Sequence, residues 1–165
     1  MWLHDGTKLT GRYCTWHGQE YEVRDLHPSD GIFTLVVEGG DAPDSGWRTL
    51  SRRKKFGRPD VSHIRRVPQD EVSNLHKVTV TGTLGPDRNV LIVGTDNRGN
   101  LAVQSIDPMP ANYKRQLIDN YQFEPFSRNE PLEHVFIGGW LLADRITNMD
   151  VEITSYSNEK NTSID

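Results

Sequence analysis

The sequence predicts a mainly β protein, a β-rich α+β fold whose antiparallel sheets form a sandwich or a partly open barrel with one helix near 111–121. Residues 77–106 carry three strand-like runs separated by tight turns. Further strand-like runs lie on both sides of this stretch, and clear helical periodicity occurs once. Consecutive hairpins place neighbouring strands antiparallel, which predicts the sheet type.

The three central runs differ in pattern. Val78 and Val80 alternate with threonines, as in a strand with one buried face, and a Gly-Pro-Asp turn follows at 85–87. Residues 89–93 are apolar on both faces, which favours the central strand of the three. The polar run 96–100 is typical of a hairpin turn, and 101–106 gives the third strand.

The N-terminal half predicts five strands and a basic loop. The strands are expected at 8–16, 19–26, 32–38, 47–50 and 61–67, with a loop at 51–59 and a short helical turn at most within 68–75. The run 61–67 is charged enough to predict an edge strand. Cys14 lies within the first strand, where a small apolar filler is the expected role.

After the central runs, the pattern indicates a helix and two more strands. Apolar residues at helical spacing predict the helix at 111–121, and Pro110 suits its start. The run 133–146 predicts a buried strand with a bulge or bend at Gly138-Gly139, and a short helix from Trp140 is the alternative. Trp140 is expected in the core. A last strand is expected around Val151.

The domain prediction is one β-rich domain over 1–154, followed by a flexible C-terminal tail at 155–165. Two related β halves, 1–75 and 76–154, are the alternative, because Leu-Thr-Gly-Arg at 9–12 and Val-Thr-Gly-Thr at 80–83 open similar runs. The N-terminus lacks the pattern of a signal peptide, the longest apolar run is too short for a membrane span, and there is one cysteine. These features predict a cytoplasmic protein that does not enter a membrane.

The sequence contains none of the common catalytic or metal-binding motifs. The six histidines are scattered, no phosphate-binding or dinucleotide-binding glycine pattern occurs, and no Gly-x-Ser-x-Gly is present. We therefore expect no enzyme activity, no metal site and no cofactor.

The charge pattern is more informative. The chain has a net charge of −4, yet residues 48–66 hold eight of its 19 basic residues and one of its 23 acidic residues. Basic and aromatic side chains in one loop suit either a phosphate backbone with stacked bases or an acidic protein surface. A solvated loop without partner is the plain alternative. Two tryptophans stand at strand–turn junctions, where they form part of a binding face or cover the end of the core. The candidate partner-binding residues are Trp16, Trp47, Arg52, Arg53, Lys54, Lys55, Phe56 and Arg58.

In size, composition and the lack of a catalytic motif, the chain resembles the immunity proteins that bacteria keep beside secreted toxins. The resemblance implies a binding protein that inhibits a toxin enzyme by covering its active site with loops of a rigid β scaffold. The alternative is a small β module that binds nucleic acid through the basic loop 48–58. A barrel that binds a small molecule is a third class, because a pocket leaves no linear pattern.

Overall fold

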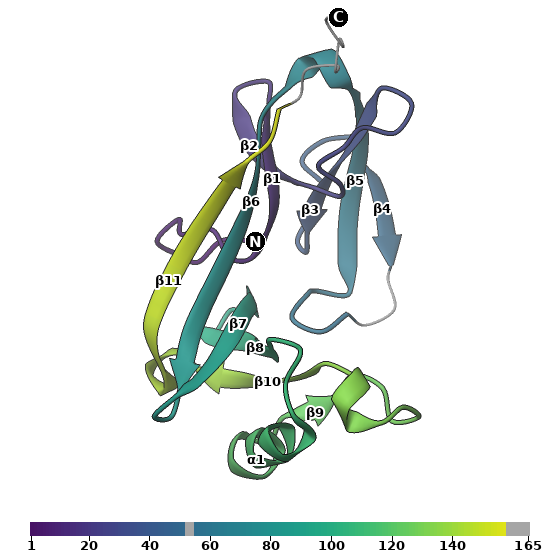
Figure 1. Ribbon diagram of the computed structural model, residues 1–165. Coiled ribbons are helices and arrows are strands. Elements are labelled where there is room, and N and C mark those ends of the chain that lie inside the picture. The colour runs from purple at the N-terminus through teal and green to yellow at the C-terminus, as the bar shows by residue number, and fades with distance from the viewer. Residues whose placement is uncertain (52–54, 158–165) are drawn as a thin grey trace, which may run out of the picture. The chain divides into compact units, whose positions relative to one another are not determined.

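The computed structural model describes residues 1–51 and 55–157 (Figure 1). Strands dominate, every strand pair is antiparallel, and the described residues contain one α-helix, so the predicted fold class is confirmed. The chain divides into two compact units. Unit 1 comprises Met1–Thr10, Phe56–Arg58 and Thr79–Glu152, and unit 2 comprises Gly11–Lys55, Pro59–Val78 and Ile153–Asp165.

Unit 2 is a sheet with the strand order β4-β5-β3-β2-β1-β6. Its strands are β1 (Gly11–Trp16), β2 (Gln19–Val23), β3 (Ile32–Glu38), β4 (Arg48–Ser51), β5 (Val61–Pro68) and the first part of β6 (Val72–Leu84), which follows the 3-10 turn η1 (Gln69–Glu71). The prediction that 61–67 forms an edge strand is wrong, because β5 pairs with β3 on one side and β4 on the other. Its charged residues fit an interior strand because Arg65 lies over the Trp16 ring at 4.8 Å and Arg66 is exposed.

One face of the unit 2 sheet carries its hydrophobic core. Alternate residues of the strands point to this face, as the period of two requires. The buried cluster contains Cys14, Trp16, Val23, Phe33, Leu35, Trp47, Val67, Val72 and Leu75.

Unit 1 contains the strand order β6-β7-β8-β10-β9, and β11 pairs with β6. Its elements are the last part of β6, β7 (Arg88–Thr95), β8 (Asn100–Ser105), α1 (Ala111–Tyr121), β9 (Glu124–Pro125), η2 (Leu132–His134), β10 (Ile137–Leu142), η3 (Ala143–Arg145) and β11 (Ile146–Ser155), whose last residues belong to unit 2. The predicted three-strand run is confirmed as β6, β7 and β8, with β7 in the middle.

The start of β6 differs from the predicted one. β6 begins at Val72, within the stretch expected to hold a helical turn at most, because the helical part is limited to Gln69–Glu71. The extended backbone resumes directly afterwards, and Val72 and Leu75 are buried on the core face. The strand start could not be predicted from the sequence, because the polar residues at 73 and 74 interrupt the alternation of apolar and polar residues.

The predicted helix is confirmed at Ala111–Tyr121. Pro110 precedes it, and Gln122 ends it in the left-handed conformation with φ 59°. The helix buries Leu117 as its spacing predicts, but it also buries Lys114, while Tyr113 is 37% exposed. None of the helices in the described ranges has the length and apolar character needed to cross a bilayer.

Trp140 is not in the core, so that prediction is wrong. In β10, Ile137 and Leu141 are buried, while Trp140 and Leu142 on the opposite parity are exposed. The apolar run is continuous in sequence, but only one of its two faces packs inward.

The boundary between the units runs through β6 at Val78, near the predicted boundary between 1–75 and 76–154, although Met1–Thr10 and Phe56–Arg58 belong to unit 1. Whether the two halves are related stays a prediction. Of the predicted tail, Ser155 is part of β11, and 158–165 lie outside the described residues.

Candidate partner-binding site

The segment Phe56–Arg58, at the end of the predicted basic loop, packs on the outer face of β7, β8 and β10 in unit 1. Its middle residue, Gly57, has φ +79°, a conformation that favours glycine. The backbone of Gly57 lies so close to β7 that a Cβ on Gly94 would overlap the Gly57 carbonyl group. Two glycines therefore allow the segment to lie directly on the sheet.

This contact places Phe56 in a cluster of aromatic rings. The ring centroid of Phe56 lies 4.9 Å from that of Phe126 and 6.1 Å from that of Trp140. Gly138 of β10 lies beneath, because a Cβ there would meet Phe56 at 2.8 Å and Phe126 at 2.9 Å. We call Phe56, Phe126 and Trp140 the aromatic cluster. Its spacing is that of attractive ring pairs.

The aromatic cluster is open to solvent. Phe126 and Trp140 are each 44% exposed. Leu142, which shares the outward parity of Trp140 along β10, is 59% exposed, and Phe136, directly before β10, is 46% exposed. Exposed apolar side chains that lie together on a folded protein mark interaction sites more often than singly scattered ones do.

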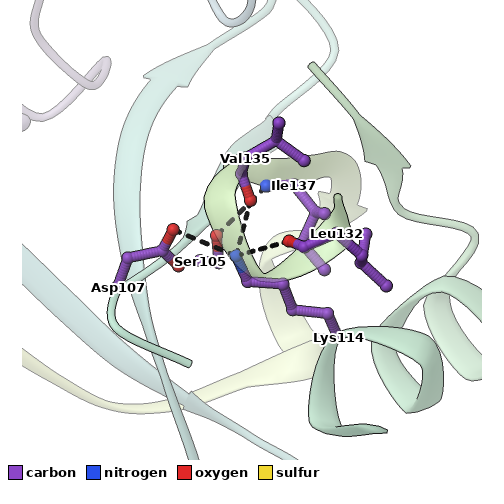
Figure 2. A network of polar contacts seen from close by, with 6 residues as sticks. All are labelled: Ser105, Asp107, Lys114, Leu132, Val135 and Ile137. Carbon is purple, nitrogen blue, oxygen red and sulfur yellow. Dashed lines mark hydrogen bonds and ion pairs between the residues drawn. The ribbon is translucent and has the colours of Figure 1, made fainter. Parts of the chain in front are cut away.

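Lys114 fixes the segment that leads into β10 (Figure 2). Its side chain is fully buried, and its ammonium group donates to the Asp107 carboxylate at 3.0 Å, to the Leu132 carbonyl oxygen at 3.0 Å and to the Val135 carbonyl oxygen. The three N–H donors of the ammonium thus have three acceptors. The network ties α1 to the chain just before β10, and so supports the strand that carries Trp140.

A second hydrogen bond also holds the start of β10 in place. The Ile137 amide donates to the Ser105 hydroxyl oxygen at 3.1 Å, which joins the end of β8 to the start of β10. Both groups are buried, so the bond satisfies polar atoms that water does not reach.

Comparison with models of protein families, with curated proteins and with solved structures finds no match. The residues and geometry of the chain itself therefore carry the functional argument.

The predicted binding residues are distributed unevenly. Phe56 belongs to the aromatic cluster, and Arg58 donates to the Thr10 carbonyl oxygen at 3.4 Å, which helps to hold the segment on unit 1. Lys55 is exposed and belongs to unit 2. Arg52, Arg53 and Lys54 lie outside the described residues.

Trp16 and Trp47 are buried in the core of unit 2, with 8% and 7% exposure. The Trp16 indole stacks on His17 at 3.8 Å and donates to Glu71 at 3.2 Å, and the Trp47 ring lies 5.4 Å from that of Tyr21. These contacts fit the interpretation in which both tryptophans cover the core. Their part in partner binding stays a prediction, and burial leaves them little surface for it.

Phe126 and Trp140 were missed as candidate residues. Phe126 lies in a proline-rich, irregular stretch, where the sequence gives no face to assign. The sequence did contain a pattern that separates Trp140 from the core residues. Phe136, Trp140 and Leu142 occupy even positions, and Val135, Ile137 and Leu141 occupy odd positions, so the two sets would face opposite sides of a strand. The sequence cannot show which parity faces inward.

His76 and Cys14, which could in principle take part in chemistry, are packed among other side chains in the described part of unit 2. In unit 2, Tyr13 stacks on His76 at 5.7 Å, and the Nδ1 atom of His76 lies 2.7 Å from the Asn74 carbonyl oxygen. Burial, with a smaller contribution from Glu20, raises the pKa of the Cys14 thiol to about 12, so the thiol is protonated at neutral pH. Within the described ranges, no three His, Cys, Asp or Glu residues are placed to hold a metal ion.

A cavity of about 670 Å³ lies beside α1 and β9 in unit 1. Its lining includes Ile118, Phe123, Glu124, Arg128, Leu132 and Val135. Apolar walls with one guanidinium and nearby carboxylates suit many ligands equally well, so the cavity does not indicate a ligand class.

Proposed function

We propose that the protein is a non-catalytic binding protein that docks on a protein partner through the aromatic cluster. The observation that carries this proposal is the joint exposure of Phe126 and Trp140, at 44% each, where Trp140 lies on a strand held by buried contacts and Phe126 directly follows β9. Tryptophan is among the residues that most often dominate binding energy at protein interfaces. Because the rings are already held by neighbouring groups, little side-chain entropy is lost on binding.

In this proposal the partner is a toxin enzyme, and the protein acts as an immunity protein in the cytoplasm by covering the toxin's active site. The support is the general resemblance in size and composition, together with a rigid apolar platform that suits stoichiometric docking. The positive charge of the basic loop 48–58 would speed encounter with an acidic partner.

Nucleic-acid binding is the competing function, since Phe56 directly follows a basic run and exposed rings can stack on bases. The charge of unit 1 argues against it. The residues of unit 1 include eight basic and eleven acidic side chains, so unit 1 has a net negative charge that, beyond the basic run before Phe56, would repel a long polyanion. We therefore favour a protein partner.

The test is to co-express the protein with the product of the adjoining reading frame in a host that this product poisons. Wild-type protein should restore growth and co-purify with the product in a fixed ratio. The double substitution Phe126→Ser/Trp140→Ser should lose both effects. Ile106→Ser/Tyr113→Ser, which removes similarly exposed apolar side chains of unit 1, should keep them.

A fluorescein-labelled single-stranded oligonucleotide tests the competing function on the same purified proteins. Binding that weakens steeply with salt and is lost in Phe126→Ser/Trp140→Ser would replace the protein partner by nucleic acid. Growth rescue that survives this double substitution would remove the aromatic cluster from the proposal.

A further inference from the structure

β11 has an unusual exposure pattern for a strand. Ile146 is buried, but every residue from Thr147 to Glu152, the part that belongs to unit 1, is exposed. Met149 and Val151 are 42% and 45% exposed. Antiparallel strands commonly bury one face, so a strand with both faces in solvent leaves apolar side chains uncovered.

The two faces of this part of β11 differ in chemistry. Side chains alternate along a strand, so Met149 and Val151 share one face, while Asp150 and Glu152 share the other. In the ranges that the structure describes, neither carboxylate makes an ion pair. One face is thus apolar, and the other carries two unpaired negative charges.

The backbone of β11 also has a neighbour on one side only. β6 is its sole paired strand within the described ranges (Figure 1). The opposite edge presents N–H and C=O groups that can accept one further strand.

We propose that β11 binds an extended segment of a protein partner by strand addition, and that this segment alternates apolar residues with lysine or arginine. Main-chain hydrogen bonds to the open edge would supply the pairing. The partner's apolar side chains would pack beside Met149 and Val151, and its basic side chains would lie beside Asp150 and Glu152. Opposite charges in neighbouring positions stabilise such pairs.

The same charges disfavour a second copy of this chain as the occupant. Antiparallel self-pairing centred on Val151 places Asp150 of one copy opposite Glu152 of the other. Self-pairing centred on Asp150 places that carboxylate opposite its own copy. Like charges directly opposite each other destabilise a strand pair, so both of these arrangements are penalised.

This surface shares no residue with the aromatic cluster, and its test does not depend on the proposed function. The probe is a short, fluorescein-labelled synthetic peptide of alternating valine and lysine, and the readout is fluorescence anisotropy with the full chain. Two control peptides have the same composition, one with its lysines grouped together and one N-methylated along its backbone.

The alternating peptide should bind, and both control peptides should bind at least about tenfold more weakly. Asp150→Asn/Glu152→Gln should weaken binding of the alternating peptide about tenfold. Asp119→Asn/Glu133→Gln, which makes the same change of charge at exposed positions on α1 and η2, should leave it unchanged. Equal binding of the N-methylated peptide, equal loss in the control variant, or no binding of the alternating peptide would each overturn the proposal. A dimer of the protein alone that Val151→Lys abolishes would identify a second copy as the occupant, which also overturns it.

Discussion

The ammonium group of Lys114 lies 3.0 Å from the carboxylate of Asp107, and its side chain is fully buried. A buried cation is costly unless it is paired and its donors are all satisfied, and this one also donates to two carbonyl oxygens. The pair links the end of β8 to α1 and to the chain before β10. The position of the candidate site therefore depends on a polar group within the core of unit 1.

Replacing Lys114 by methionine should destabilise the protein by about 3 kcal/mol, because Asp107 and the carbonyl groups of Leu132 and Val135 lose their donor. Urea unfolding monitored by circular dichroism measures the change. Arg115→Met, at the neighbouring exposed position of the same helix, is the matched control and should change the free energy of unfolding little. Equal stability of the two variants would show that the buried pair does not support the fold.

Gly94→Ala should displace the segment Phe56–Arg58, because the added methyl group would overlap the Gly57 carbonyl group. Overpacking of this kind typically costs about 1–3 kcal/mol. Gly11→Ala is the control, since a Cβ there meets its nearest neighbours at 3.4 Å, an ordinary contact. The ring-proton NMR signals of Phe126 and Trp140 should shift in Gly94→Ala and stay in place in Gly11→Ala. Unshifted signals in Gly94→Ala would contradict the close packing of Gly57 on β7.

Cys14 should resist alkylation in the native protein. Burial raises the pKa of its thiol to about 12, so little thiolate forms at pH 8, and the sulfur is out of reach of the reagent. Mass spectrometry after treatment with iodoacetamide should detect modification in guanidinium chloride but not in buffer. Rapid modification in buffer would mean that β1 opens readily.

Asp96 should stabilise the turn between β7 and β8 in its charged form. Hydrogen bonds from the Asn100 side chain, and from the backbone amides of Asn100 and Arg98, lower the pKa of this carboxyl from its ordinary value of 3.8. A lowered pKa adds stability above the unfolded value, and that stability is lost as the pH falls through the lower native value. Asp96→Asn should therefore be less stable than wild type at pH 7, and the difference should shrink below pH 3.8. A difference that does not vary with pH would contradict a role for the charge.

The fold was more predictable from the sequence than the candidate site. Turn residues and alternation mark β6, β7 and β8, and helical spacing marks α1, because these are local properties of the chain. The position of β5 inside its sheet could not be read from its charges, since long arginine side chains can lie over neighbouring groups, as Arg65 does over Trp16. Strand order is decided by partners far away in the sequence.

The candidate site was partly predicted, because Phe56 and Arg58 were singled out from the basic loop. The remaining rings of the aromatic cluster come from β10 and from the chain next to β9, about 70 to 84 residues further along. Only packing brings them together. Lys114 was not expected in the core, since a charged residue in a helix usually faces water, and nothing local indicates the three acceptors that surround it.

Calorimetric titration of the purified partner with wild-type protein and with Phe126→Ser/Trp140→Ser tests the central claim most directly. We expect one partner molecule per chain for the wild type. Loss of two central aromatic anchors should weaken binding by a factor on the order of 100 or more. An unchanged dissociation constant in the double variant, with the fold intact by circular dichroism, would contradict the claim that the aromatic cluster binds the partner.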